Sequence, residues 1–227
     1  MVRRRPAPRR VTDLGLALGV LVAVLGASPA AAQAPPTAPG PFAIDFQGAM
    51  ASIPSDVGFY PPVPSGTIVP SRGFGLNVGG HVYLFSLGPS RVGVGASLLR
   101  ARGTASEPVA ATTAAGTPPS KPDVAASVTA IAPQLSLNFG HAEGWSYVSA
   151  GFGRGRVRST TSAFGSGTAA KPEAALEGKS ASSLNFGFGA RWFTSRHMAF
   201  SFDVRFHMLS TTPKTTLTVG SVGISLK

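Results

Sequence analysis

Apolar and polar residues alternate with a period of two along much of this chain, and no other feature limits its fold as strongly. Over residues 197–209 one face is apolar and consists of Met198, Phe200, Phe202, Val204, Phe206 and Met208. The other face carries His197, Ser201, Asp203, Arg205 and His207. Successive side chains of a β-strand point to opposite faces, whereas a helix repeats about every 3.6 residues. The segment therefore predicts a strand.

Eight segments share this alternation: residues 42–50, 73–85, 92–98, 129–139, 145–152, 184–192, 197–209 and 216–226. Most are close to the roughly 9 to 11 residues that a tilted strand needs to cross a membrane. Short turns near 88–90, 141–143 and 195–196 alternate with long loops at 53–72, 103–125 and 159–180 and a shorter loop around Pro213. Alternating short turns and long loops are typical of membrane barrels. The sequence predicts an all-β fold, an eight-stranded antiparallel up-and-down transmembrane β-barrel over residues 42–227.

The first residues have the pattern of an export signal. Five arginines at positions 3, 4, 5, 9 and 10 precede an apolar run from Leu14 to Gly26, which is too short to span a membrane. Small residues follow, so we predict a signal peptide over residues 1–32, cleaved before Gln33, and a proline-rich periplasmic leader over 33–41. Its removal takes five of the 20 basic and one of the nine acidic residues and leaves a net charge of +7. In an exported chain with scattered basic residues, this charge favours an anionic membrane surface over nucleic acid.

Alternation alone does not say which face points inward, because a soluble lipocalin-like barrel would turn its apolar face to the centre. The polar face is rich in glycine, for example at Gly79, Gly95 and Gly189, and glycine on a water-facing strand weakens the strand for no gain. Inside a narrow barrel it makes room for large side chains. Turning Arg205 outward would place it against hydrocarbon at a cost of roughly 2 to 4 kcal/mol. We therefore expect the apolar face to point outward.

The signal, the eight alternating segments and the loop asymmetry make the chain resemble the small eight-stranded outer-membrane barrels of the OmpA and OmpX type. The resemblance implies an integral protein of the Gram-negative cell envelope. Its implied partners are outer-membrane lipid, lipopolysaccharide and, during insertion, the barrel-assembly machinery. Barrels of this type usually end in an aromatic residue, whereas this chain ends in Leu226 and Lys227.

A polar network is predicted inside the barrel, because unpaired charges in such a narrow lumen would be costly. Its expected members are Asp45, Asn77, Asn138, Asn185, Arg191, Asp203 and Arg205. Such a network would plug the lumen. The alternative is a narrow polar channel for small solutes, although open aqueous pores belong to barrels of about 16 to 18 strands.

Two further sets of residues are candidates for contact with the membrane. Arg154, Arg156 and Arg158 lie at the outer end of a strand, where lipopolysaccharide phosphates could accept bidentate hydrogen bonds; the alternative is a solvated rim. Trp145 and Trp192 lie near short turns, where an aromatic belt would need them; the alternative is ordinary packing.

Catalytic, metal and cofactor sites are not predicted. His207 and Ser210 fall on opposite faces of a strand with no carboxylate placed to orient the histidine, and the four histidines lack paired-ligand spacing. Cysteine is absent. We therefore expect a non-enzymatic barrel with a structural role or a role in surface interactions through its loops. A lipid-modifying barrel enzyme and a soluble binding barrel are the less favoured alternatives.

Overall fold

The fold is seen in a computed structural model that describes residues 40–107, 121–141 and 143–227. The predicted signal peptide, 1–32, and nearly all of the predicted leader, 33–41, lie outside these residues. The helical elements of the described part are the short 3-10 turns η1 (Val57–Phe59) and η2 (Gly167–Ala169). Within that part no helix is long and apolar enough to cross a membrane.

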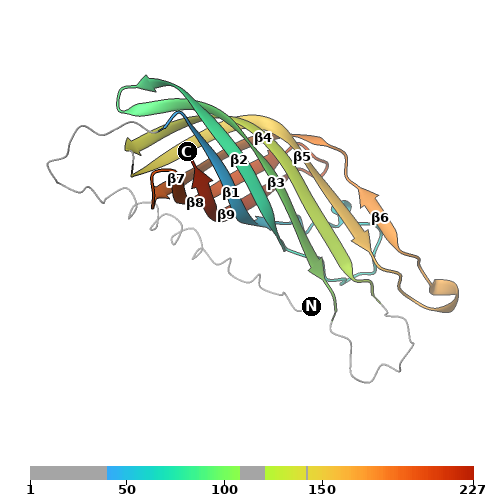
Figure 1. Ribbon diagram of the computed structural model, residues 1–227. Coiled ribbons are helices and arrows are strands. Elements are labelled where there is room, and N and C mark those ends of the chain that lie inside the picture. Colours follow the sequence, from blue (N-terminus) through green and yellow to red (C-terminus); the bar gives the residue numbers. More distant parts are fainter. Residues whose placement is uncertain (1–39, 108–120, 142) are drawn as a thin grey trace, which may run out of the picture. The chain divides into compact units, whose positions relative to one another are not determined.

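Eight long strands form a closed antiparallel barrel (Figure 1). They are β1 (Phe42–Ser52), β2 (Arg72–Leu87), β3 (Ser90–Ala105), β4 (Val124–His141), β5 (Gly144–Thr161), β7 (Ala181–Phe193), β8 (Met198–Leu209) and β9 (Thr215–Leu226). Strands next to each other in the chain pair, β5 pairs with β7, and β1 pairs with β9, so the sheet closes on itself. The predicted barrel is confirmed, and each strand covers its predicted segment to within one residue.

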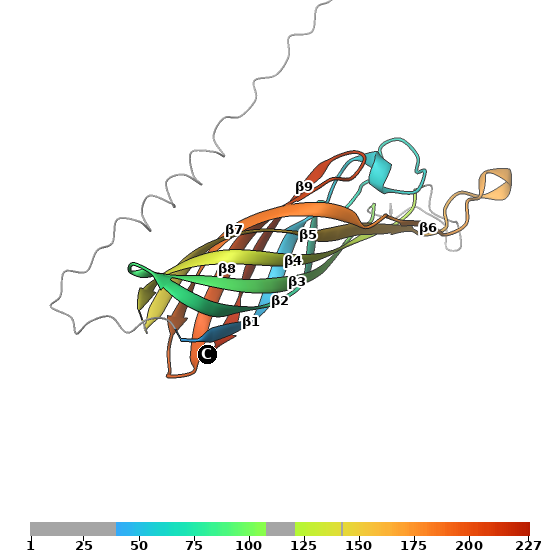
Figure 2. The same cartoon turned by 90° about the horizontal axis from the view of Figure 1, so that it is seen from above.

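The two ends of the barrel differ. At the turn end, where β1 begins and β9 ends, the strands are joined by short connections around residues 88, 142 and 195. At the loop end β3 ends and β4 begins, and the connections 53–71, 162–180 and 210–214 join the other strands there. The connection 162–180 contains the short strand β6 (Ala174–Glu177), which pairs with the end of β5 (Figure 2). It lies on the same side of β5 as β7, past the residues of β5 that pair with β7.

Strands β3, β4 and β5 continue further toward the loop end than the sequence predicted. On β5 the alternation persists beyond Phe152, but its polarity inverts: arginines face outward while Gly155, Val157 and Ser159 are buried inside. The sequence prediction ended β5 at this inversion because it assumed that the outer face of every strand is apolar. β4 and β5 pair in one register on both sides of it, from Val124 with Thr161 to Ile131 with Arg154 and from Leu135 with Ala150 to His141 with Gly144.

The apolar face points outward, as expected. Phe200 is 51% exposed on the outer wall of β8, whereas Asp203 and Arg205 are each 2% exposed inside the barrel. The wall therefore presents large apolar side chains on the outside, where a soluble lipocalin-like barrel would have polar ones.

The interior has two halves of different character. The half near the turn end is polar, as predicted. The half near the loop end is apolar and is lined by small and branched residues, among them Ala51, Leu99, Val128, Val157 and Leu217. The prediction of a polar lumen is therefore wrong for this half.

Inward-facing glycines make room for large side chains in the polar half. A Cβ atom on Gly95 would lie 2.5 Å from Cδ2 of His81, and one on Gly189 would lie 2.6 Å from the Tyr147 hydroxyl. An alanine at either position would also collide with a backbone carbonyl oxygen of the neighbouring strand, that of Gly80 at 2.3 Å from a Cβ atom on Gly95 and that of Phe202 at 2.4 Å from one on Gly189. Both the close backbone and the ring beside it therefore require glycine at these two positions.

Candidate functional site

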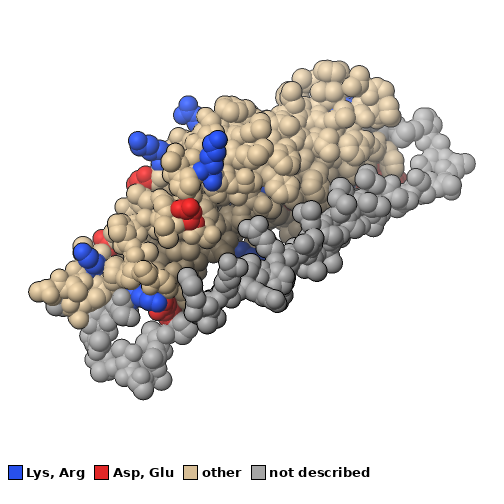
Figure 3. All heavy atoms as spheres, turned by 180° about the vertical axis from the view of Figure 1, so that it is seen from behind, with Lys and Arg blue, Asp and Glu red and all other residues tan. Residues whose placement is uncertain are grey.

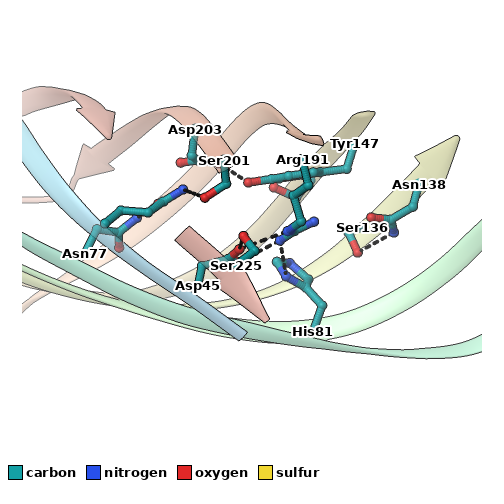
Figure 4. A network of polar contacts seen from close by, with 12 residues as sticks. Asp45, Asn77, His81, Ser136, Asn138, Tyr147, Arg191, Ser201, Asp203 and Ser225 are labelled. Atoms are coloured by element: carbon teal, nitrogen blue, oxygen red, sulfur yellow. Dashed lines mark hydrogen bonds and ion pairs between the residues drawn. The ribbon is translucent and has the colours of Figure 1, made fainter. Parts of the chain in front are cut away.

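A buried ion pair crosses the polar half of the lumen from β1 to β7. Arg191 donates from Nε to Oδ1 of Asp45 at 2.9 Å and from Nη2 to Oδ2 at 2.6 Å, a bidentate arrangement. Ser225 on β9 donates to the same carboxylate, and Nδ1 of His81 lies 3.3 Å from Nη2 of Arg191. Figure 4 shows these side chains converging from four strands. The Arg191 side chain is completely buried.

A second charged cluster lies beside the first. Arg205 donates to Asp203 at 3.2 Å, to Oδ1 of Asn185 at 3.0 Å and to Ser149 at 3.0 Å. The hydroxyl of Tyr147 donates to Oδ2 of Asp203 at 2.8 Å. Tyr147 also links the two clusters, because the guanidinium of Arg191 lies 4.4 Å from the centre of its ring.

The two remaining predicted members of the network lie apart from the charges. Asn77 donates to Gln47, which in turn donates to Ser201, each at 3.1 Å. Asn138 donates to Ser136 at 2.9 Å and to the carbonyl of Arg91. All seven predicted residues face the lumen, and five of them, Asp45, Asn185, Arg191, Asp203 and Arg205, belong to the two linked clusters.

Sequence reasoning did not include Gln47, His81, Gln134, Tyr147 or Ser225 in this network. Each lies on the inward face of its strand, so the period of two could have found them. The prediction named only charged residues and asparagines of this face. A cavity of about 10 Å³ remains among these side chains, which is room for about one water molecule.

The apolar half of the lumen is covered by the loop that joins β1 to β2. Ile53, Phe59 and Tyr60 of this loop are 5%, 9% and 4% exposed and pack against the inner wall. Ser159 on β5 donates to the carbonyl of Phe59 at 2.7 Å, and Tyr60 donates to the carbonyl of Pro54 at 2.7 Å. Burial raises the pKa of the Tyr60 phenol to about 12. We call residues 53–71 the cap loop.

The three candidate arginines lie near the loop end of β5. Arg154, Arg156 and Arg158 occupy successive outward positions directly after the outward Phe152, and all three are exposed. Arg158 pairs with Glu177 of β6 at 2.7 Å, with both side chains half exposed. Figure 3 shows one face of the molecule, on which basic groups, with acidic groups among them, gather over one half and leave most of the other half free of charge.

The expectation for Trp145 is wrong. Its side chain is 2% exposed and lies inside the barrel, edge-on to Tyr83 with ring centres 5.9 Å apart. Trp145 shares the inward face of β5 with Tyr147 and Ser149, whereas the outward positions are Val148, Ala150 and Phe152, so proximity to a turn misled the assignment. Trp192 does point outward: it is 51% exposed and stacks on Phe202 with ring centres 5.7 Å apart.

The described residues contain no group of three or more histidine, aspartate or glutamate side chains that could hold a metal ion. His207 is buried inside the barrel, while Ser210 lies exposed beyond the end of β8. The histidine considered as a base is thus buried in the lumen and the serine is exposed beyond the strand, and no hydrogen bond between them is present in the described part of the chain.

Comparisons with known proteins agree with this geometry. The model of a family described as outer membrane protein beta-barrel domain matches residues 18–227. No curated protein matches the chain. Among solved structures, the attachment invasion locus protein Ail of Yersinia pestis superposes with a TM-score of 0.50 at 14% identity, over 82% of this chain and 96% of Ail.

Two further solved structures are similar. A complex of Ail with the heparin analogue sucrose octasulfate gives a TM-score of 0.50 at 13% identity, again over 82% of this chain and 96% of the other. The neisserial surface protein NspA gives a TM-score of 0.44 at 11% identity, with the same coverage. Identities this low concern the fold alone. Because the family model matches almost the whole chain and the strands close as such a domain requires, the chain belongs to the outer membrane protein beta-barrel domain family.

Proposed function

We propose that this chain is an integral outer-membrane barrel, exported with a cleaved signal peptide and inserted by the barrel-assembly machinery. In this proposal it is not an enzyme, and it acts in envelope integrity and in interactions at the cell surface. One observation carries the proposal: the barrel has an apolar outer wall around an axis filled with side chains. A protein built in this way offers its outer wall and loops, rather than its interior, to other molecules.

A plugged lumen is supported in both halves. In the polar half, the bidentate pair of Asp45 and Arg191 spans the lumen, and a cavity of only about 10 Å³ lies beside it. In the other half, the cap loop packs Phe59 and Tyr60 against an apolar lining. A hydrated ion would have to break the first barrier and lose its water at the second.

Lipopolysaccharide is the proposed partner of the outer wall. Arg154, Arg156 and Arg158 follow the apolar surface of β5 at its loop end. In this proposal the outer headgroups lie at the level of these arginines. Guanidinium groups bind phosphate and sulfate oxygens in a bidentate manner. The complex of Ail with sucrose octasulfate provides a related barrel with a polyanionic ligand.

Conductance across a planar bilayer tests the proposal. The purified barrel is first checked for heat-dependent gel migration, because a closed barrel resists detergent until it is boiled. We expect the folded protein to give no stable conductance above that of the bilayer alone. A large and stable conductance from protein that passes the gel test would favour the narrow channel and overturn the plugged barrel.

A further inference from the structure

The register of β3, β4 and β5 brings a second set of arginines next to the first. Arg100 and Arg102 on β3 face outward and are exposed, as are Arg156 and Arg158 on β5. Along β4, Thr129 pairs with both Arg100 and Arg156. Ser127 pairs with both Arg102 and Arg158.

Four arginines therefore stand at the corners of a rectangle on the outer wall. Its long side is two strand spacings, about 10 Å, and its short side is two residues along a strand, about 7 Å. The centre is occupied by the small hydroxyl side chains of Thr129 and Ser127, which leave the guanidinium groups room to turn toward a shared ligand. We call these six residues the arginine frame.

The frame begins where the apolar wall ends. Leu98, Ile131 and Phe152 are the last large apolar residues on the outward faces of β3, β4 and β5, and they are 48%, 53% and 65% exposed. On β4 the outward apolar residues from Ile131 to Phe139 cover about 27 Å of strand, or roughly 20 Å of height at a tilt of about 40°. A membrane that covers this band places its outer headgroups at the level of the frame.

Most arginines of the frame form no ion pair with the residues that the structure describes. In the part of the chain that the structure describes, Arg100, Arg102 and Arg156 have no ion-pair partner, and neither has the adjacent Arg154. Like charges this close repel each other, and a bound anion would remove this electrostatic repulsion. Only the corner at Arg158 is partly neutralised, by Glu177.

We infer that the arginine frame binds one membrane lipid whose headgroup carries two phosphates, with the β3 arginines holding one phosphate and the β5 arginines the other. This inference rests on the proposed contact of β5 with lipopolysaccharide and adds β3 as an equal partner. Glu177 competes with the lipid for Arg158. The occupant is a lipid rather than a soluble anion, because the frame directly adjoins the hydrocarbon level.

The test compares lipids that differ in one phosphate. The barrel is reconstituted in phosphatidylcholine nanodiscs, and binding of the diphosphorylated lipid anchor of lipopolysaccharide is measured by native mass spectrometry. The comparison lipids are the monophosphorylated anchor and phosphatidylglycerol. Each is added at the same total lipid charge as the diphosphorylated anchor. We expect the native protein to prefer the diphosphorylated form by about tenfold, the effect of one lost bidentate phosphate contact.

Variants separate the two sides of the frame. Both Arg100→Gln/Arg102→Gln and Arg156→Gln/Arg158→Gln should abolish the preference for the second phosphate, while Glu177→Gln should strengthen binding. The control Lys171→Gln/Arg196→Gln removes the same charge from exposed sites outside the frame and should leave the preference unchanged. Gel migration confirms folding, and Arg100→Lys/Arg102→Lys, which keeps the charge but not the bidentate geometry, replaces a β3 variant that does not fold.

The outcomes are distinguishable. If the β5 variant weakens binding and the β3 variant does not, the contact with lipopolysaccharide stands and the two-sided frame is rejected. If neither variant has an effect, both proposals fall. Equal binding of phosphatidylglycerol would also overturn the frame, because attraction would then follow charge alone.

Discussion

Asp45 and Arg191 illustrate how single residues maintain the filled axis. Each is buried, and each is the counter-charge of the other through two hydrogen bonds. A buried pair of this kind contributes little compared with apolar residues of the same size, but removing one partner leaves an uncompensated charge. Replacing one member of the pair should therefore lower the stability of the barrel strongly, whereas replacing both members together should lower it less.

We predict that Asp45→Asn destabilises the folded barrel by about 3 to 5 kcal/mol, because Arg191 keeps its charge and loses its carboxylate. The double variant Asp45→Leu/Arg191→Met should lose less folding stability than Asp45→Asn, because no unpaired charge remains. Equilibrium urea unfolding in detergent micelles, followed by tryptophan fluorescence, measures both changes.

Glu173→Gln is the matched control, because it removes a carboxylate from an exposed position near β6 and should change stability little. A double variant that is less stable than Asp45→Asn would contradict the argument. The ion pair would then stabilise the barrel by more than the mutual neutralisation of its two buried charges.

Among the elements of the fold, the cap loop carries a side chain whose ionisation should depend on whether the loop is docked. Tyr60 is outside the strands, is buried against the apolar lining, and has a pKa raised to about 12 from an ordinary value of about 10. When the loop leaves the barrel mouth, the phenol regains its ordinary pKa. Between these two values the docked loop binds more protons than the undocked loop, so docking weakens as the pH rises.

We predict that docking of the cap loop is independent of the ionisation of Tyr60 below pH of about 10 and weakens above it, by at most about 1.4 kcal/mol per pH unit. The difference in ultraviolet absorbance between the native protein and Tyr60→Phe during an alkaline titration isolates this phenol among the three tyrosines. Cleavage of the loop by a protease active at high pH follows undocking.

In Tyr60→Phe the loop should resist cleavage at pH values where the native loop is cut, because phenylalanine has no proton to lose. A titration midpoint near 10 in the native protein would show that the docked phenol is solvated. Cleavage that is equally fast in both proteins would separate docking from this ionisation.

The strands could be predicted from the sequence because every membrane-level segment obeys one rule, apolar outside and small or polar inside. The rule fails in the loop-end half, where Val157 points inward between Arg156 and Arg158. Neither the short strand β6 nor the cap loop has an alternation to detect, and both depend on contacts with distant strands. The pairing of Asp45 with Arg191 was anticipated in type, but its partners His81 and Ser225 depend on how the strands are staggered.

Over the whole molecule, the polar and apolar halves of the lumen lie one after the other along the axis. The polar half contains the linked clusters of Asp45, Arg191, Asp203 and Arg205, and the apolar half ends at the cap loop. An ion crossing the barrel would meet both in series. The resistance of such a path is set by whichever half remains closed.

We predict that neither half alone determines whether the barrel conducts. Asp45→Ser/Arg191→Ser removes the ion pair and should leave the barrel silent in planar bilayers, because the apolar half still excludes hydrated ions. Replacing residues 55–66 with a short glycine and serine linker removes Phe59 and Tyr60 and should also leave it silent, because the ion pair remains. Combining the two changes should produce a conductance that neither produces alone.

Heat-dependent gel migration must show a closed barrel for all three variants, so that leakage through unfolded protein is excluded. Conductance from the linker variant alone would mean that the polar network is permeable and that the cap loop is the only barrier. Conductance from Asp45→Ser/Arg191→Ser alone would assign the barrier to the ion pair instead. Silence of the combined variant would place a further barrier in the remaining lining, where Leu99, Val128 and Leu217 are almost completely buried.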